Sequence, residues 1–273
     1  MLRLETDSGY WLVTHVDHAQ LAGEFAARWG NDKFSAPEPR ARVLKGVSRH
    51  DDGWRDRDRE PQITRHGKPS AFSVELVGKY SAFEEIDLAD YLAVRERAVM
   101  LIAEEDPYAA ILVSMHTYNL LSERADRSTI AAEQLSLLDD FLGRQRTLQQ
   151  KLLDQIAADI LLRAEHKSAT VIRNHFRLLQ ACDNLSLLAC VDYRRPATLL
   201  HPLPLKDGGY QMVAVESIGE RSFKLEPYPF ADSPLLFSFP GRHVAGKVFP
   251  NTEELRERFA AAPVALLQVR VCG

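Results

Sequence analysis

The sequence predicts a mainly helical core with an accessory β-sheet, which makes the chain α+β overall. Apolar residues recur at helical spacing through almost the whole of residues 87–193. Short apolar segments separated by Gly, Pro and Asp lie before and after this region, as is typical of strands and turns. Because such segments occur at both ends of the chain, we expect them to pair in one sheet beside the helical body.

The N-terminal part predicts a hairpin followed by two helices. Asp7-Ser8-Gly9 is a suitable turn between two short strands. After it, His18, Leu21 and Phe25 share one face of a helix that Gly30 ends. The expected elements are strands at 2–6 and 10–14, a helix from Asp17 to Gly30 and, after Pro39, a second helix from Arg40 to about His50.

Residues 55–81 have no clear periodicity. Arginines and acidic residues alternate in 55–60, where we expect a solvated, salt-bridged loop. Residues 61–81 contain Gly67 and Pro69, and they could form a plain connection or a flap over a pocket.

The remaining elements follow from the periodicity, which is helical up to Tyr193 and strand-like after Pro196. We expect one integrated unit over residues 1–273, with a helical core at about 15–193 and a β-rich part at about 197–273; a separate C-terminal domain is the alternative. The expected helices are 87–104, 107–123, 129–164 (with a break in it as an alternative), 168–191 and 252–261, and the expected strands are 199–205, 210–218, 222–226, 235–239 and 264–271.

Composition and charge exclude several classes of protein. Hydrophobic residues make up 45% and charged residues 26% of the 273, as in ordinary globular proteins. The formal net charge is -4, so we expect no nucleic-acid partner. Three widely spaced cysteines do not suggest a disulfide framework, and neither a signal peptide nor a run of about 18 apolar residues is present. The sequence therefore predicts a cytoplasmic protein without a membrane partner.

Five polar residues lie where the pattern predicts burial, which is costly for an unpaired polar group. Taken singly, each is most simply a hydrogen-bonded core residue or a helix cap. Together they offer nitrogen and oxygen ligands that suit one or two divalent transition-metal ions, such as Fe, Mn, Co, Ni or Zn. The five are His18, His116 and Asp183 on apolar helix faces, and His50 and Asp51 at the end of the second helix.

The order of these residues resembles the HD superfamily of helical metal-dependent phosphohydrolases. The His50-Asp51 doublet matches the motif of that superfamily, and residues 178–186 look like its late helix with a central Asp. The resemblance implies an HD-domain-like helical bundle. It also implies that His18, His50, Asp51 and Asp183 hold one metal, with His116 on a second metal or directed at the substrate.

A closer similarity is to an uncharacterised bacterial family of unknown function. Its hallmarks extend over nearly the whole chain, which favours one unit over two domains. They are Trp11-Leu12-Val13-Thr14, Asp17-His18-Ala19, His50-Asp51-Asp52-Gly53-Trp54, Asp106-Pro107-Tyr108-Ala109, Ser114-Met115-His116, the helix with Asp183 and Pro227-Tyr228-Pro229-Phe230.

One departure from the HD pattern concerns phosphate binding. Many HD phosphohydrolases contain His-Asp-x-Gly-Lys, whereas Trp54 stands at the lysine position here. Lys45, Arg49 or Arg55 could supply the missing charge. We expect Trp54 to anchor the turn in the core, with a substrate platform as the alternative.

The resemblance favours a metal-dependent hydrolase that acts on a phosphoester through a metal-activated water. Its substrate would be a small molecule, with a phosphorylated one favoured. Asp52 would orient a histidine or act as a general base, and His116 is the second candidate for a direct catalytic role.

Two other functions stay open. A di-iron oxygenase of HD type would need a larger ligand set, to which His116 and a reserve histidine, His15 or His175, would contribute. A non-catalytic sensor or binding protein would use the same pocket behind a closed ligand shell. Leucines of the predicted helix 129–164 could form the face of a homodimer, although core packing explains them as well.

Overall fold

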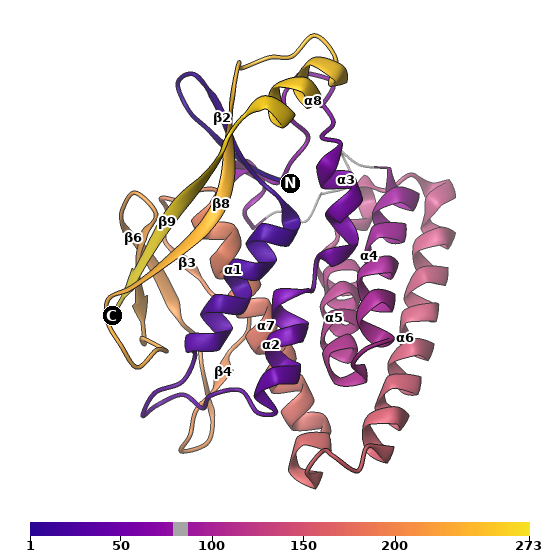
Figure 1. Ribbon diagram of the computed structural model, residues 1–273. Helices are drawn as coiled ribbons and strands as arrows, with labels where there is room; N and C mark the ends of the chain where they lie inside the picture. Colours follow the sequence, from indigo (N-terminus) through magenta and orange to yellow (C-terminus); the bar gives the residue numbers. More distant parts are fainter. Residues whose placement is uncertain (79–86) are drawn as a thin grey trace.

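The computed structural model describes residues 1–78 and 87–273, and its elements form three layers (Figure 1). A curled sheet forms the first layer. Helices α1 (His15–Arg28), α2 (Arg40–Ser48) and α7 (Ala169–Cys190) form the middle layer. The outer layer consists of α4 (Leu88–Ala103), α5 (Pro107–Asn119) and α6 (Leu135–Ala158).

The sheet has seven strands in the order β1-β2-β8-β9-β7-β6-β3, so the two ends of the chain pair as predicted. All neighbours are antiparallel except β7 and β9, which are parallel. The strands are β1 (Leu2–Glu5), β2 (Gly9–Val13), β3 (Ala197–Thr198), β6 (Ala214–Gly219), β7 (Ser222–Glu226), β8 (Leu235–Ala245) and β9 (Val264–Cys272), while β4 (Leu203–Pro204) and β5 (Tyr210–Gln211) form a separate pair.

The expected HD-like helical bundle with an accessory sheet is wrong, although α+β remains a fair description. About 51% of the structure is helical and about 20% lies in strands. The sheet shares the main core with the helices, since Phe25 of α1 packs edge-on against Phe237 of β8 with ring centroids 4.8 Å apart. The prediction ended this strand at Phe239 because Pro240 and Gly241 usually interrupt strands. In the structure β8 continues through both residues, beside the whole of β9.

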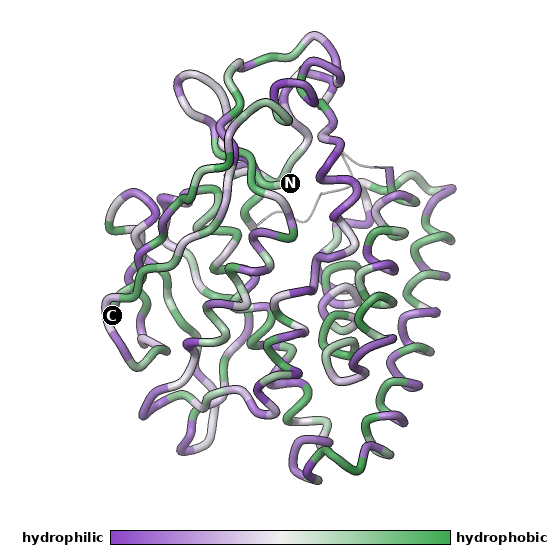
Figure 2. Tube along the Cα trace, viewed as in Figure 1, coloured by the Kyte–Doolittle hydropathy of each residue, from purple (hydrophilic) through white to green (hydrophobic). Residues whose placement is uncertain are grey.

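The helices largely follow the predicted segments but are shorter. Asp87, Asp106 and Ser168 cap α4, α5 and α7 with their side chains. The predicted helix 107–123 changes to a π-helical turn after Asn119, and the predicted helix 129–164 is regular only over α6. In Figure 2, α6 alternates between hydrophilic and hydrophobic residues, as expected of a helix at the outside of the molecule.

Leu138 and Leu152 of α6 are buried within the chain, in agreement with core packing, and a homodimer stays a prediction. In the part of the chain that the structure describes, no helix combines the length and apolarity needed to cross a membrane.

The charged segment after the His-Asp doublet is largely exposed and salt-bridged as expected, but it is a helix and not a loop. Residues Arg55–Arg59 form the short helix α3, and Asp58 within it is only 4% exposed. Several residues of 61–78 line the cavity described below. The end of the predicted flap, residues 79–81, lies outside the described residues. A last helix, α8 (Thr252–Ala261), begins at an Asn251 cap and connects β8 to β9.

Gly53 allows the turn after the doublet to pack directly on α4. It lies in a 3₁₀ turn, Asp52–Trp54, and a Cβ atom at this position would stand 2.2 Å from the Val94 carbonyl oxygen and 2.7 Å from the Ala98 nitrogen. Backbone atoms of a helix cannot move aside, so only glycine fits here. The glycine thereby places the residues before it against α4.

We expect Gly53→Ala to lower the free energy of unfolding by about 1–3 kcal/mol, the usual cost of overpacking. Chemical denaturation measures the change. The matched control is Gly143→Ala in α6, where a Cβ would meet nothing within 4 Å and the better helix propensity should raise stability by up to about 1 kcal/mol. Equal effects of the two substitutions would contradict the close packing of Gly53.

Candidate metal centre

Five side chains from different parts of the chain meet at one buried point between the middle and outer layers. Helix α2 ends at Ser48, and Arg49 leaves the helical conformation with φ -119° and ψ 10°. Because of this change, the two residues that follow both turn toward the same point. The structure thus brings together all five predicted residues: His18 from α1, His50 and Asp51 after α2, His116 from α5 and Asp183 from α7.

The separations of the donor atoms suit a metal ion. His18 Nε2 lies 3.1 Å from Asp51 Oδ2, and His50 Nε2 lies 3.2 Å from Asp183 Oδ1. Ligand atoms bound about 2.1 Å from a common ion stand roughly 3.0–3.4 Å apart. Two overlapping groups, His18-His50-Asp51 and His50-His116-Asp183, each have their donor atoms within 4.8 Å of one another. These buried groups could therefore hold an ion.

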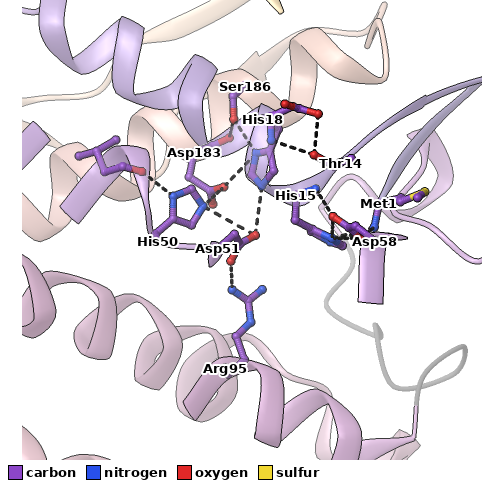
Figure 3. Close-up of polar contacts among 12 residues, drawn as sticks. Met1, Thr14, His15, His18, His50, Asp51, Asp58, Arg95, Asp183 and Ser186 are labelled. Carbon is purple, nitrogen blue, oxygen red and sulfur yellow. Dashed lines mark hydrogen bonds and ion pairs between the residues drawn. The ribbon is translucent and has the colours of Figure 1, made fainter. Parts of the chain in front are cut away.

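Hydrogen bonds orient the two central histidines with Nε2 toward the carboxylates (Figure 3). His50 Nδ1 donates to the Val47 carbonyl oxygen over 2.7 Å, so its buried Nε2 faces Asp183 Oδ1, and within the described residues this nitrogen makes no hydrogen bond of good geometry. The Ser186 hydroxyl donates to the carbonyl oxygen of Asp183, so it accepts from Nδ1–H of His18 at 2.9 Å. Metal-binding histidines are typically held in this way by their second nitrogen.

His116 completes the group from the side of α5. Its ring centroid lies 5.1 Å from that of His50, and the Gln180 amide group lies 3.1 Å from its Nδ1. Amide oxygen and nitrogen are assigned from such contacts. With the amide turned by half a rotation, its carbonyl oxygen accepts from Nδ1–H of His116, and Nε2 then carries the free lone pair.

Arg95 of α4 is the buried cation beside the centre. Its Nη1 donates to Asp51 Oδ1, its Nε donates to the Tyr91 hydroxyl over 3.1 Å, and the guanidinium lies 5.5 Å from the centroid of the Trp54 ring. Burial alone would raise the pKa of Asp51. Arg95 and the histidines outweigh burial and hold this pKa well below its ordinary value, so Asp51 is a carboxylate.

The same competition sets the charges of the other members. Burial disfavours the charged forms of His50 and Asp183. At His50 the charge of Asp51 and the contact with Asp183 outweigh burial. At Asp183 the contact with His50 and the nearby His116 and His18 outweigh it. The pKa of His50 is raised to about 9 and that of Asp183 is lowered to about 2. Burial lowers the pKa of His116 to about 3, so this ring is neutral. In the absence of an ion, two carboxylates are thus balanced by Arg95 and the proton of His50.

A cavity of about 170 Å³ reaches the centre. Four of the five central residues line it, together with Arg95, and leucines of α7 and of the π-helical turn after α5 form another part of its wall. A small molecule in this cavity would therefore touch the metal-binding side chains.

Other predicted residues lie elsewhere. The Asp52 carboxylate accepts from Arg49 Nε over 2.7 Å and from Arg55 over 3.3 Å, and the structure does not bring it to the histidines. Lys45 pairs with Glu105, so it supplies no charge at the centre. The sequence analysis considered Lys45, Arg49 and Arg55 as sources of positive charge. In the structure the cation beside the centre is Arg95.

The reserve histidines also have other partners. His175 Nδ1 lies 2.8 Å from the Tyr108 hydroxyl, and His15 Nδ1 lies 3.0 Å from Asp58 Oδ1. The His15 ring stacks on Trp54 with centroids 4.1 Å apart, and both residues line the cavity. Trp54 is thus buried, as expected of an anchor, and it also borders the pocket. Sequence reasoning overlooked Arg95 and Asp58, which lie in runs of charged residues.

The chain belongs to a family described as "Protein of unknown function (DUF3891)", whose model matches residues 1–246. This match confirms the predicted membership of an uncharacterised family, and it does not extend to the HD superfamily. No curated protein and no solved structure gives a significant match to the chain. The family supplies no activity, so any function has to be argued from the site.

We expect the stability of the protein to fall as the pH decreases from about 6.5 to 4, in part because of His175. Burial lowers the pKa of His175 to about 4, so the unfolded chain gains a proton in this range and the folded protein does not. His175→Gln should make the decline in unfolding free energy less steep by up to about 1.4 kcal/mol per pH unit. Chemical denaturation at several pH values measures the unfolding free energy and its slope against pH. The exposed His66→Gln is the control, and the same slope for both variants would refute the assignment.

Proposed function

We propose that this member of the DUF3891 family is a metal-dependent hydrolase acting on a phosphoester. The observation that carries the proposal is the buried set of His18, His50, Asp51 and Asp183 at a cavity, with Nε2 of His50 turned toward Asp183 Oδ1. These four residues would hold a divalent ion, and His116 would lie beside it or act as a further ligand.

The donor set and the charges support an ion followed by an anionic ligand. Imidazole nitrogens mixed with carboxylates favour Fe, Mn, Co, Ni or Zn over Ca. A divalent ion would take the place of the proton on His50. With two carboxylates and Arg95, the centre would then have one positive charge in excess. A phosphate ester is an anion of the kind that such a centre attracts.

A divalent ion in this position would lower the pKa of a water molecule and polarise the phosphoryl group. In the hydrolysis, the water oxygen forms a bond to phosphorus and the ester P–O bond breaks. The products are inorganic phosphate and the alcohol, which takes the proton that the water loses. Arg95 would hold the phosphoryl oxygens, a role that the sequence pattern led us to expect of a lysine at the position of Trp54.

The pair of His15 and Asp58 offers a route for the proton. His15 lies one helical turn before His18, with ring centroids 6.0 Å apart, and it lines the same cavity. Burial lowers the pKa of His15 to about 4, so its ring is neutral and able to accept a proton. Asp58 Oδ1 lies 3.0 Å from Nδ1 of this ring and would orient it, while the N-terminal amine of Met1 contacts both groups.

The alternatives have less support. An oxygenase with two irons would need a reserve histidine, but His15 and His175 bind Asp58 and Tyr108. A sensor with a closed ligand shell is disfavoured because the cavity reaches the ligands. The order of the ligands along the chain, on which the resemblance to HD phosphohydrolases rests, supports hydrolysis even though the fold is not the bundle of that superfamily.

We expect the untagged protein to contain close to one equivalent of Fe, Mn, Co, Ni or Zn by elemental mass spectrometry. The double variant Asp51→Ala, Asp183→Ala should lose it, because two of the four proposed ligands are removed. The matched control is Asp52→Asn, which should keep the metal because Asp52 faces Arg49 and Arg55. If the purified protein contains no metal and takes up none when metal is added, the metal site and the proposed activity are both refuted.

For a protein that contains metal, release of phosphate from a panel of phosphoesters tests the reaction. We expect the activity to disappear on chelation and to return with the metal found in the protein. A loaded protein that cleaves none of the esters would leave the metal site standing and overturn the hydrolase.

A further inference from the structure

Part of the cavity wall is apolar. Leu76, Leu120, Leu187 and Leu200 line it, and each is only half-buried. Leucines that border a concave space with part of their surface uncovered provide a site for an apolar group, which gains free energy by leaving water there. The lining of the cavity therefore includes an apolar part besides its polar groups.

Arg95 adds a site for an anion to the polar part. Its hydrogen bonds to described residues use Nε and Nη1, and the second terminal nitrogen, Nη2, lies beside Nη1 with no contact drawn to it (Figure 3). Because Arg95 lines the cavity, this nitrogen can donate to a bound molecule. A guanidinium group beside a centre of excess positive charge is well suited to the oxygens of a phosphoryl group.

The volume limits the size of the molecule. The cavity measures about 170 Å³, and a cavity of about 150 Å³ in another protein takes up benzene. A phosphoryl group with one ring, or with an aliphatic group of the same size, fits this space. A nucleoside exceeds this volume, so part of it would extend out of the open mouth of the cavity.

We propose that the substrate is the phosphate monoester of a small apolar alcohol, about as large as one aromatic ring. The phosphoryl group would bind the metal ion and Nη2 of Arg95, with the organic group against Leu120, Leu187 and Leu200. Water then releases inorganic phosphate and the apolar alcohol by the reaction described above. This inference rests on the proposed function and adds the class of its substrate.

The test is calorimetric titration of the metal-loaded full chain with benzylphosphonate, methylphosphonate and adenosine 5′-phosphonate, which cannot be hydrolysed at their P–C bond. We expect benzylphosphonate to bind at least about tenfold more tightly than methylphosphonate, because only its ring reaches the leucines. Adenosine 5′-phosphonate should bind more weakly than benzylphosphonate. The metal content of each sample is measured in parallel.

The outcomes separate the two proposals. A protein without metal overturns the proposed function and this inference with it. A loaded protein that binds the benzyl and methyl compounds equally, or binds neither, overturns only the substrate class. Binding of the adenosine compound as tight as that of benzylphosphonate overturns the limit on size.

Substitutions assign the two parts of the cavity. Leu187→Asn, with Leu200→Asn as a second variant, should reduce the ratio of the affinity for benzylphosphonate to that for methylphosphonate to less than about threefold. The affinity for methylphosphonate itself should stay unchanged. Leu266→Asn, at a leucine of β9 that is 72% exposed, is the matched control and should change neither affinity. Arg95→Lys should weaken both compounds by a similar factor of about ten, because lysine lacks the fork of donors. An undiminished benzyl advantage in both leucine variants would contradict the proposed wall.

Discussion

The ion pair between Asp51 and Arg95 is the contact on which the arrangement of the site depends. A buried charge without a partner costs several kcal/mol, so a carboxylate at this depth requires a cation of fixed position. Arg95 comes from α4, whereas Asp51 follows α2, and the two can meet only if the turn at Gly53 rests on α4. The histidines then occupy the other side of Asp51. One pair of charges thus links two layers of helices and positions the residues proposed to bind metal.

The sequence predicted the members of the site whose burial follows from helical periodicity. His18, His116 and Asp183 stand on apolar faces, and the structure places each of them at the centre. Arg95 follows the same rule, since it shares a face of α4 with Leu92 and Val99, but it stands beside Glu96 and Arg97 and was not recognised as a buried residue. Periodicity identifies a buried residue, whereas its partner comes from a distant segment and is not visible in the pattern. Asp58 was missed for the same reason among the alternating charges of α3.

The fold was predicted less well than the positions of the buried polar residues. The positions of most helices could be recognised because each is set by its own apolar spacing and caps. The importance of the sheet could not be recognised in this way, because the sheet is formed by pairs of strands that lie far apart in the chain, such as β2 with β8 and β7 with β9. Local rules also failed at Pro240 and Gly241. Gly241 is suited to its place because Leu267 of β9 lies over it, with a Cδ1 atom 2.9 Å from where a Cβ would be.

The place of β9 in the sheet has a consequence for the order of assembly. It is the strand that joins β8 to β7, and so it connects the half with β1, β2 and β8 to the half with β3, β6 and β7. In a chain made from the N-terminus, both halves precede β9, and each keeps an unpaired edge until it arrives. Such edges attract strands of other chains. The nascent protein is therefore most exposed to aggregation just before its sheet closes, a stage at which the helices around the site can already be in place.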